Sequence, residues 1–322
     1  MTTAPLRIAL LLLAAPALAA QTAGSVESVA PGIELVPGEF RPGRQPDGNS
    51  VLLRGPEGFV VVDSGRHEEH ARRVLEAARA ANAPIVAVVN THWHLDHVSG
   101  NALLRREAPG LRVFASGAIF AAREGFLADY RRQLEGALAG EASEAQKREW
   151  REEIARIDAG DALVPDEVVV ASGAHRLAGR ELRIELVEKA VTAGDLWLLD
   201  PKTSTLIAGD LVTLPVPFLD TACPANWRAA LDRLAGESFE RLVPGHGPVL
   251  ARTGFERYRT GFGNLLDCAA SDAPVEACAA GWRRDLGPLL DGSDSDHVRS
   301  LLDYYVGQVV RAGAERDARF CR

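Results

Sequence analysis

The sequence predicts an α/β fold, and three observations indicate it. Residues 28–63 alternate short apolar and polar runs with glycine and proline between them, which is typical of antiparallel strands. Residues 67–81 place apolar side chains three or four positions apart, as an amphipathic helix does. The apolar run 85–89 that follows is short and rich in valine, which indicates a buried strand at 85–90. We therefore expect strands and helices to alternate along the chain.

The later elements follow from the same patterns. A short helix is expected from about Asn101, and a short strand at 113–115. Residues 117–158 are rich in Ala, Arg and Glu and have helical spacing, which predicts a helical insertion. Strands are expected to return over 166–210, and a helix follows at 226–236.

Composition and charge exclude some partners. The chain has 44 acidic and 36 basic residues, which gives a formal net charge of −8. No basic stripe interrupts this charge, so we do not expect nucleic acid as a partner. The hydrophobic fraction of 47% and the charged fraction of 25% are ordinary for a globular protein with a large core. The sequence leaves the oligomeric state open.

Residues 1–19 are typical of a cleaved signal peptide. Arg7 precedes an apolar run at 8–15, and Pro16-Ala17-Leu18-Ala19 supplies the small residues of a cleavage site. The apolar run is too short to span a bilayer as a permanent helix; the alternative is an uncleaved N-terminal anchor. We expect an exported protein, periplasmic or secreted, with no stable membrane insertion after cleavage.

A helical C-terminal extension is expected over 251–322, and its cysteines indicate disulfides. The chain has four cysteines, all in its last hundred residues: Cys223, Cys268, Cys278 and Cys321. Three pairings are possible. We favour Cys268–Cys278 because the residues between them have the pattern of a turn between helices, which leaves Cys223 for Cys321. The alternative is four reduced thiols, but an exported protein meets an oxidising compartment.

The strongest functional signal follows the apolar run 85–89. Three imidazoles and a carboxylate occur within six residues, in the segment Thr91-His92-Trp93-His94-Leu95-Asp96-His97. Imidazole nitrogen and carboxylate oxygen are ligands that zinc prefers. Alternate residues of an extended chain point the same way, so His92 and His94 can bind one metal together. Asp96 and His97 lie beyond the strand, where the chain turns, and could face a second metal. The alternative is a solvated loop that is rich in histidine.

This segment resembles the His-x-His-x-Asp-His signature of the metallo-β-lactamase superfamily, and three further motifs resemble that family in the same order. They are Phe59-Val60-Val61-Val62-Asp63-Ser64-Gly65, Leu206-Ile207-Ala208-Gly209-Asp210 and Leu242-Val243-Pro244-Gly245-His246-Gly247. The resemblance implies an αβ/βα four-layer sandwich over residues 20–250. In that family an insertion such as 117–158 usually covers the active site; the alternative is a pair of surface helices. Trp93 is expected to serve in packing.

The chain departs from the family at one metal ligand. The family usually has a third His for the first site in a segment such as Ala-His-Thr-x-Gly-Asp, and this chain has Val191 at that position. The other histidines are placed away from the motifs: His67 and His70 in a helix, His175 in a turn and His297 in the C-terminal tail. Glu188 is the nearest possible substitute, but three residues along a strand should make it face the opposite side.

The resemblance implies a zinc site with these residues as ligands: His92, His94, Asp96, His97, Asp210 and His246. Asp96, His97 and Asp210 are expected to be catalytic, and Asp63 either orients a ligand or caps the helix near 67. Because Val191 replaces one ligand, we expect one tight zinc ion at Asp96, His97 and His246, and a second that is weak or absent. No cysteine lies at a ligand position.

Two function classes follow from the resemblance. The first is an exported zinc-dependent hydrolase that uses a metal-bound hydroxide on an ester, thioester, lactone or lactam. The second is a catalytically lapsed or non-hydrolytic member that binds a ligand or partner. A sulfur dioxygenase is disfavoured, because those enzymes seat iron at the site that Val191 disrupts. The expected partner of the enzyme is a small-molecule substrate, with specificity set by 117–158 and the loop 212–224.

Overall fold

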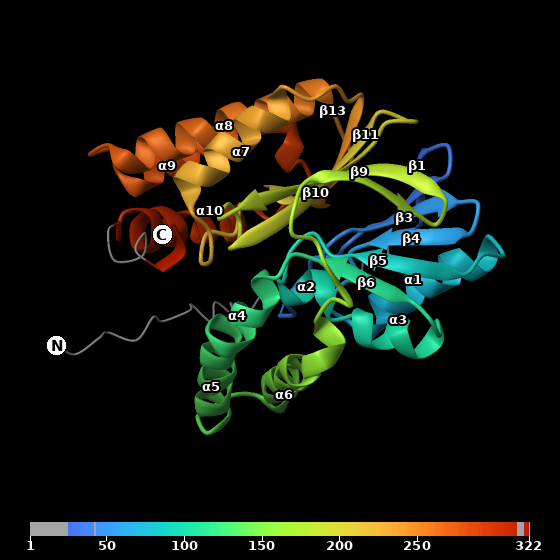
Figure 1. The fold of residues 1–322 in the computed structure, drawn as a ribbon. Coiled ribbons are helices and arrows are strands. Elements are labelled where there is room, and N and C mark those ends of the chain that lie inside the picture. Colours follow the sequence, from blue (N-terminus) through green and yellow to red (C-terminus); the bar gives the residue numbers. More distant parts are fainter. Residues whose placement is uncertain (1–24, 42, 314–318, 322) are drawn as a thin grey trace.

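Two mixed β-sheets lie face to face in the computed structural model, which describes residues 25–41, 43–313 and 319–321 (Figure 1). The predicted signal peptide lies outside the described residues. In the first sheet the strands stand side by side in chain order: β1 (Glu27–Ala30), β2 (Ile33–Val36), β3 (Ser50–Gly55), β4 (Gly58–Val62), β5 (Ile85–Val89), β6 (Arg112–Ala115) and β7 (Glu167–Val168). Pairs β1 to β4 are antiparallel, and β4 to β7 are parallel.

The second sheet is formed by the later strands, which lie in reverse chain order. They are β13 (Leu250–Ala251), β12 (Arg241–His246), β11 (Thr205–Thr213), β10 (Gly194–Asp200), β9 (Arg180–Glu188) and β8 (Gly173–Leu177). Strands β11 and β12 are parallel and the other pairs are antiparallel. The prediction of a turn at His175 is wrong, because this residue pairs with Leu182 inside the β8–β9 hairpin.

Helices cover the outer face of each sheet, so the molecule has the four layers that were predicted. Helices α1 (Glu68–Ala80) and α3 (Asn101–Glu107) pack on the first sheet through Val74, Leu75 and Leu104. A separate core between the sheets contains side chains of both, such as Val60 and Leu198. Strands β4 and β5 are buried on both faces, which explains why each is a continuous apolar run in the sequence.

The helical insertion projects from the edge where the first sheet meets the candidate ligand segment, residues 91–97 (Figure 1). It consists of α4 (Ala118–Glu124), α5 (Phe126–Leu138), α6 (Glu144–Asp158) and a 3-10 turn, Gly160–Leu163. Its apolar side chains Ile119 and Leu127 form one core with Trp93 and Leu95 of the candidate ligand segment. The insertion is therefore packed against that segment rather than a separate pair of surface helices.

The C-terminal extension covers the second sheet together with α7 (Pro224–Ala235). It comprises α8 (Arg252–Ala270), α9 (Val275–Leu286), a 3-10 turn at Gly287–Leu290, α10 (Ser295–Tyr304) and a π-helical turn at Tyr305–Val310. Both favoured disulfides are present, Cys268–Cys278 between α8 and α9 and Cys223–Cys321 at the start of α7. Within the described residues, no helix is long and apolar enough to cross a membrane.

Candidate metal centre

The candidate ligands lie at the ends of neighbouring strands. His92 and His94 follow β5, and Asp96 and His97 lie in the short helix α2 (Leu95–Val98). Asp210 lies within β11, and His246 is the last residue of β12, the parallel neighbour of β11. Gly245 is required between these two strands, because a Cβ atom there would collide with the Asp210 carboxylate. The Pro-Gly-His sequence thus lets His246 and Asp210 approach each other.

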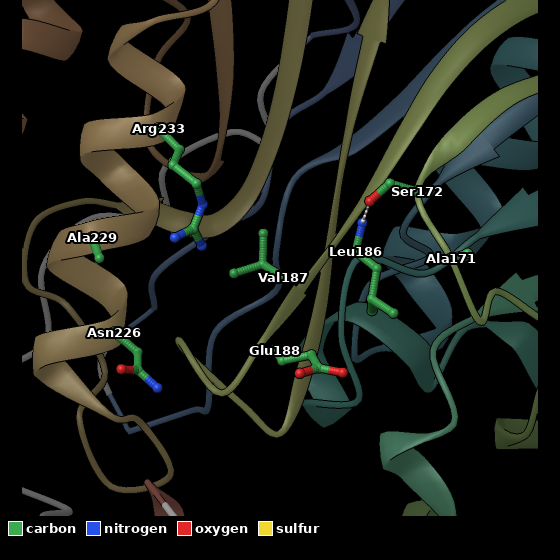
Figure 2. Close-up of a pocket in the computed structure, with 8 residues that line it drawn as sticks. All are labelled: Ala171, Ser172, Leu186, Val187, Glu188, Asn226, Ala229 and Arg233. Atoms are coloured by element: carbon green, nitrogen blue, oxygen red, sulfur yellow. Dashed lines mark hydrogen bonds between the residues drawn. The ribbon is translucent and has the colours of Figure 1, made fainter.

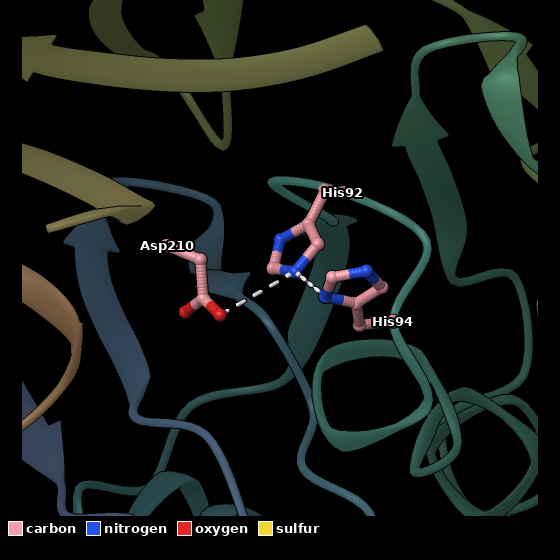
Figure 3. A group of neighbouring side chains, drawn as sticks. All are labelled: His92, His94 and Asp210. Atoms are coloured by element: carbon pink, nitrogen blue, oxygen red, sulfur yellow. Dashed lines mark hydrogen bonds and ion pairs between the residues drawn. The ribbon is translucent and has the colours of Figure 1, made fainter. Parts of the chain in front are cut away.

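The first cluster consists of His92, His94 and Asp210 (Figure 3). His92 Nε2 lies 2.8 Å from His94 Nδ1 and 3.8 Å from Asp210 Oδ2. All three side chains are buried. Burial lowers the pKa of His94 to about 3 and the pKa of His92 well below its usual value, so both rings are neutral at pH 7. Neutral imidazole is the form that binds a metal.

The second cluster consists of Asp96, His97 and His246. His246 Nε2 lies 3.0 Å from Asp96 Oδ2 and 3.3 Å from His97 Nε2. Asp210 also faces this cluster, because its Oδ1 atom is 3.2 Å from His97 Nε2 and 3.6 Å from His246 Nε2. The two oxygens of Asp210 therefore point to different clusters, as a residue shared by two sites requires.

Asp63 fixes two of the imidazole rings. His97 Nδ1 lies 2.8 Å from Asp63 Oδ2, and Thr91 Oγ1 donates to the same oxygen at 2.7 Å. Because the Thr91 proton is used, Thr91 Oγ1 accepts from His92 Nδ1 at 3.0 Å. In the neutral form of each ring, Nε2 is then the nitrogen that carries no proton and faces the centre. The alternative role of Asp63 as a helix cap is wrong, since the N-cap of α1 is His67.

Thr221 holds the ring of His94, a contact that the sequence did not predict. Its hydroxyl donates to the Val191 carbonyl at 3.0 Å and accepts from His94 Nε2 at 2.8 Å. His94 Nδ1 is thereby left unprotonated toward His92. The Val191 side chain is 1% exposed and belongs to the apolar core of the second sheet and its helices. At this position the chain supplies a backbone acceptor and no metal ligand.

The donor set fits a metal ion. Asp210 Oδ1 is buried and accepts no hydrogen bond, although three imidazole Nε2 atoms lie around that carboxylate. Burial opposes the charge on Asp210, but His97 and His246 lower its pKa to about 2. Burial also opposes a charge on His97, yet Asp210, Asp63 and Asp96 raise its pKa well above the usual value. These carboxylates make the second cluster a place where positive charge is favoured, as a cation site requires.

Glu188 does not complete the first cluster. It lines a cavity of about 610 Å³ between β9 and α7, together with Asn226 and Arg233 (Figure 2). Neither ligand cluster in the described part of the chain includes it. The predicted orientation of Glu188, away from His92 and His94, agrees with this position.

A loop between β2 and β3 covers the second cluster, and no pattern in the sequence predicted it. Gly48 N donates to the Asp96 carbonyl at 3.0 Å, and a Cβ at this glycine would collide with the His97 ring. Asn49 Nδ2 donates to the carbonyls of Pro244 and Gly247, each at 2.9 Å, on both sides of His246. The loop therefore ties the ligands of the first sheet to the ligand of the second.

Two aromatic rings flank the centre. The Phe40 ring lies 5.4 Å from that of His246 and is 46% exposed, although it is a large apolar residue. Phe218, in the loop between β11 and α7, lies 5.1 Å from the His94 ring. Each cluster therefore has an apolar wall beside it.

The family model described as the metallo-beta-lactamase superfamily matches residues 43–246, which contain every candidate ligand. The chain belongs to the metallo-beta-lactamase superfamily. Its homologues in this superfamily are hydrolases. The superfamily typically binds zinc, in agreement with the His and Asp groups found here.

Three relatives show how far the superfamily likeness extends. A linear primary-alkylsulfatase of Pseudomonas sp. is 27% identical over 225 residues, which are 62% of this chain and 42% of the relative. The chain thus spans less than half of that curated relative. Among solved structures, a metallo-beta-lactamase from Pontibacter korlensis is 20% identical and covers 74% of this chain and 99% of its own, with a TM-score of 0.56. An inverting sec-alkylsulfatase from Pseudomonas sp. is 19% identical, with a TM-score of 0.59. The match covers 91% of this chain and 51% of the sulfatase.

Proposed function

We propose that this chain is an exported zinc-dependent hydrolase that cleaves an ester, thioester, lactone or lactam. The observation that carries the proposal is the orientation of the histidines. The outer nitrogens of His92, His94 and His97 each have a polar partner, which leaves the other nitrogen of each ring facing the clusters that contain Asp96 and Asp210. Such convergence of imidazole nitrogens and carboxylates, without thiolates, is typical of catalytic zinc sites.

The residues have separate roles in this proposal. His92, His94 and Asp210 would hold one ion, and Asp96, His97 and His246 with Asp210 the other. A bound zinc ion lowers the pKa of its water to about 7 and polarises the bond to be cleaved. Asp63 orients His97 directly and His92 through Thr91. Phe40 and Phe218 bind apolar parts of a substrate and keep water away from them.

We infer that one ion is held tightly, at the second cluster. That cluster keeps all its imidazoles and is surrounded by three carboxylates, Asp63, Asp96 and Asp210. The first cluster lacks the third imidazole because Val191 stands at that position. The proposed stoichiometry is therefore close to one zinc per chain after dialysis.

Sulfate esters are a second candidate substrate class. The observation that favours them is the 27% identity to a linear primary-alkylsulfatase. The match covers only part of that relative, so the type of bond that is cleaved has to be tested directly. A panel of chromogenic ester, thioester, lactone, lactam and alkyl sulfate substrates would identify the class.

The same panel separates a hydrolase from a non-hydrolytic binding protein. We expect turnover of at least one substrate, loss of that turnover with a chelator, and recovery when zinc is added back. A protein that binds zinc but hydrolyses no member of the panel would favour the binding role. The two disulfides support export, because such bonds persist in oxidising compartments.

A further inference from the structure

A buried glutamate of the insertion lies close to the second cluster. Glu153 is on α6, whose only other buried residue is Trp150. Its side chain is 3% exposed, and burial of an unpaired carboxylate would be costly. Two arginines pair with it: Arg66 through Nη1, and Arg156 Nη1 at 3.0 Å. The Glu153 carboxylate of this polar helix therefore points inward, toward Arg66 from another part of the chain.

Arg66 connects this glutamate to a metal ligand. It lies between β4 and α1, and its backbone N–H donates to Asp47 Oδ1 at 2.8 Å while Nε donates to the Pro46 carbonyl at 3.0 Å. Its Nη2 atom lies 3.4 Å from Asp96 Oδ1. The other oxygen, Asp96 Oδ2, faces His246. The two oxygens of Asp96 therefore have different partners, an arginine on one side and the ligand cluster on the other.

We propose that Glu153 is a positioning residue for the metal centre and acts on Asp96 through Arg66. This inference rests on the proposed function, since it assumes that the second cluster binds zinc. The Arg66 guanidinium holds Asp96 Oδ1 in place, and the Glu153 carboxylate balances the positive charge of Arg66. Without Glu153, the unbalanced charge would lie a few ångströms from the cation and would draw the Asp96 carboxylate toward itself. Both effects weaken zinc binding.

The first test compares two neighbouring glutamates by zinc affinity. Competition with a chromophoric chelator gives the dissociation constant of the tight ion in the full-length protein. Glu153→Gln is isosteric and should weaken zinc binding roughly tenfold, as loss of groups that orient ligands does. Glu152→Gln is the matched control, because Glu152 is exposed on the same helix and pairs with Arg156, at 3.4 Å, rather than with Arg66. The control should stay within about twofold of the wild type, as expected for a surface ion pair.

The second test asks whether the effect passes through Arg66. In an Arg66→Met background, Glu153→Gln should change zinc affinity no further, because the connecting group is gone. Thermal unfolding of the metal-free proteins checks that the variants fold alike. If Glu153→Gln does not fold, Glu153→Asp, which keeps the charge but shortens its reach, replaces it under the same criterion.

The outcomes separate this inference from the proposed function. Wild-type protein without a tight zinc would overturn the proposed function and the inference with it. A wild type that binds zinc tightly, with Glu153→Gln unchanged or no weaker than Glu152→Gln, would overturn the inference alone. An equal loss in the Arg66→Met background would show that Glu153 acts by another route.

Discussion

The two ligand clusters share Asp210 but differ in the groups that hold their other ligands. In the first cluster, His92 and His94 are held by the hydroxyls of Thr91 and Thr221. In the second, His97 is held by the Asp63 carboxylate and Asp96 by the Arg66 guanidinium. A hydrogen bond to a charged group, such as Asp63, is about twice as strong as a neutral one, and the Arg66–Asp96 contact is an ion pair, so the ligands of the second cluster are fixed more firmly.

This difference explains why the loss of one histidine need not abolish metal binding. The position of Val191 affects only the first cluster, where its carbonyl takes part in holding His94 through Thr221. The second cluster has its own support from Asp63 and Arg66, which lie at the end of β4 and just beyond it. We therefore expect that the two candidate sites of this chain can be weakened separately.

The largest expected effect comes from removing ligands of the second cluster. Zinc binding of about 10–16 kcal/mol in four-ligand sites corresponds to about 3 kcal/mol per ligand, or roughly 100-fold in affinity. His97→Ala, Asp210→Ala or His246→Ala should each lose the tight ion by this factor and most of the activity. His94→Ala should keep the tight ion. Metal analysis after dialysis measures this, and full zinc content in His246→Ala would show that the second cluster is assigned wrongly.

The next effect is a gain. Val191→His restores the missing imidazole to the first cluster and should add a second ion that survives dialysis. Val191 is packed in an apolar core, and strain of about 1–3 kcal/mol from the larger ring would reduce the expected gain to roughly tenfold. The measurement is zinc per chain, with Val191→Leu as a control for packing. Two tight ions already in the wild type would show that the first cluster is not the weaker of the two sites.

The sequence predicted the fold, and the candidate ligands that it named lie together in the structure, for a local reason. His92, Asp210 and His246 each follow or end an apolar run, and such runs form the buried strands β5, β11 and β12. A His or Asp residue directly after an apolar run can be recognised in the sequence without knowledge of the tertiary structure. The order of the four motifs then indicated the sandwich.

The groups that support the ligands could not be predicted in the same way. Thr221 is 127 residues from His94, and Glu153 is 87 residues from Arg66. Threonines and glutamates are common on surfaces, so neither residue stands out in the sequence. Their roles arise from the packing of one loop and one insertion against the ligand segment, which periodicity does not encode.

A smaller effect is expected from Thr221, and it should be confined to the first cluster. Thr221→Val keeps the shape but removes the hydroxyl that accepts from His94 and donates to Val191. Zinc affinity of the first cluster should fall roughly tenfold, the lower end for loss of a group that orients a ligand. The Val191→His protein is the suitable background, because its second ion can be titrated. Thr221→Ser should retain the affinity, and loss of the tight ion in Thr221→Val would mean that the two clusters are not supported separately.

The smallest effect on bound metal should follow reduction of the disulfides. No cysteine lies in either ligand cluster, so the tight ion should remain in the reduced protein, although each bridge lost costs about 2–5 kcal/mol of stability. The Cys223–Cys321 bridge spans 98 residues and Cys268–Cys278 spans 10, so the double Cys→Ser replacement of the first pair should destabilise the protein more.

Cys223 also lies two residues after Thr221, and its backbone N–H donates to the Ala190 carbonyl, so any change in metal binding should appear at the first cluster. Thermal unfolding and zinc titration of the two pairs of variants measure both effects. If the first pair lost the tight ion while still folded, the second cluster would depend on the C-terminal extension, and its support would not be limited to Asp63, Arg66 and the insertion.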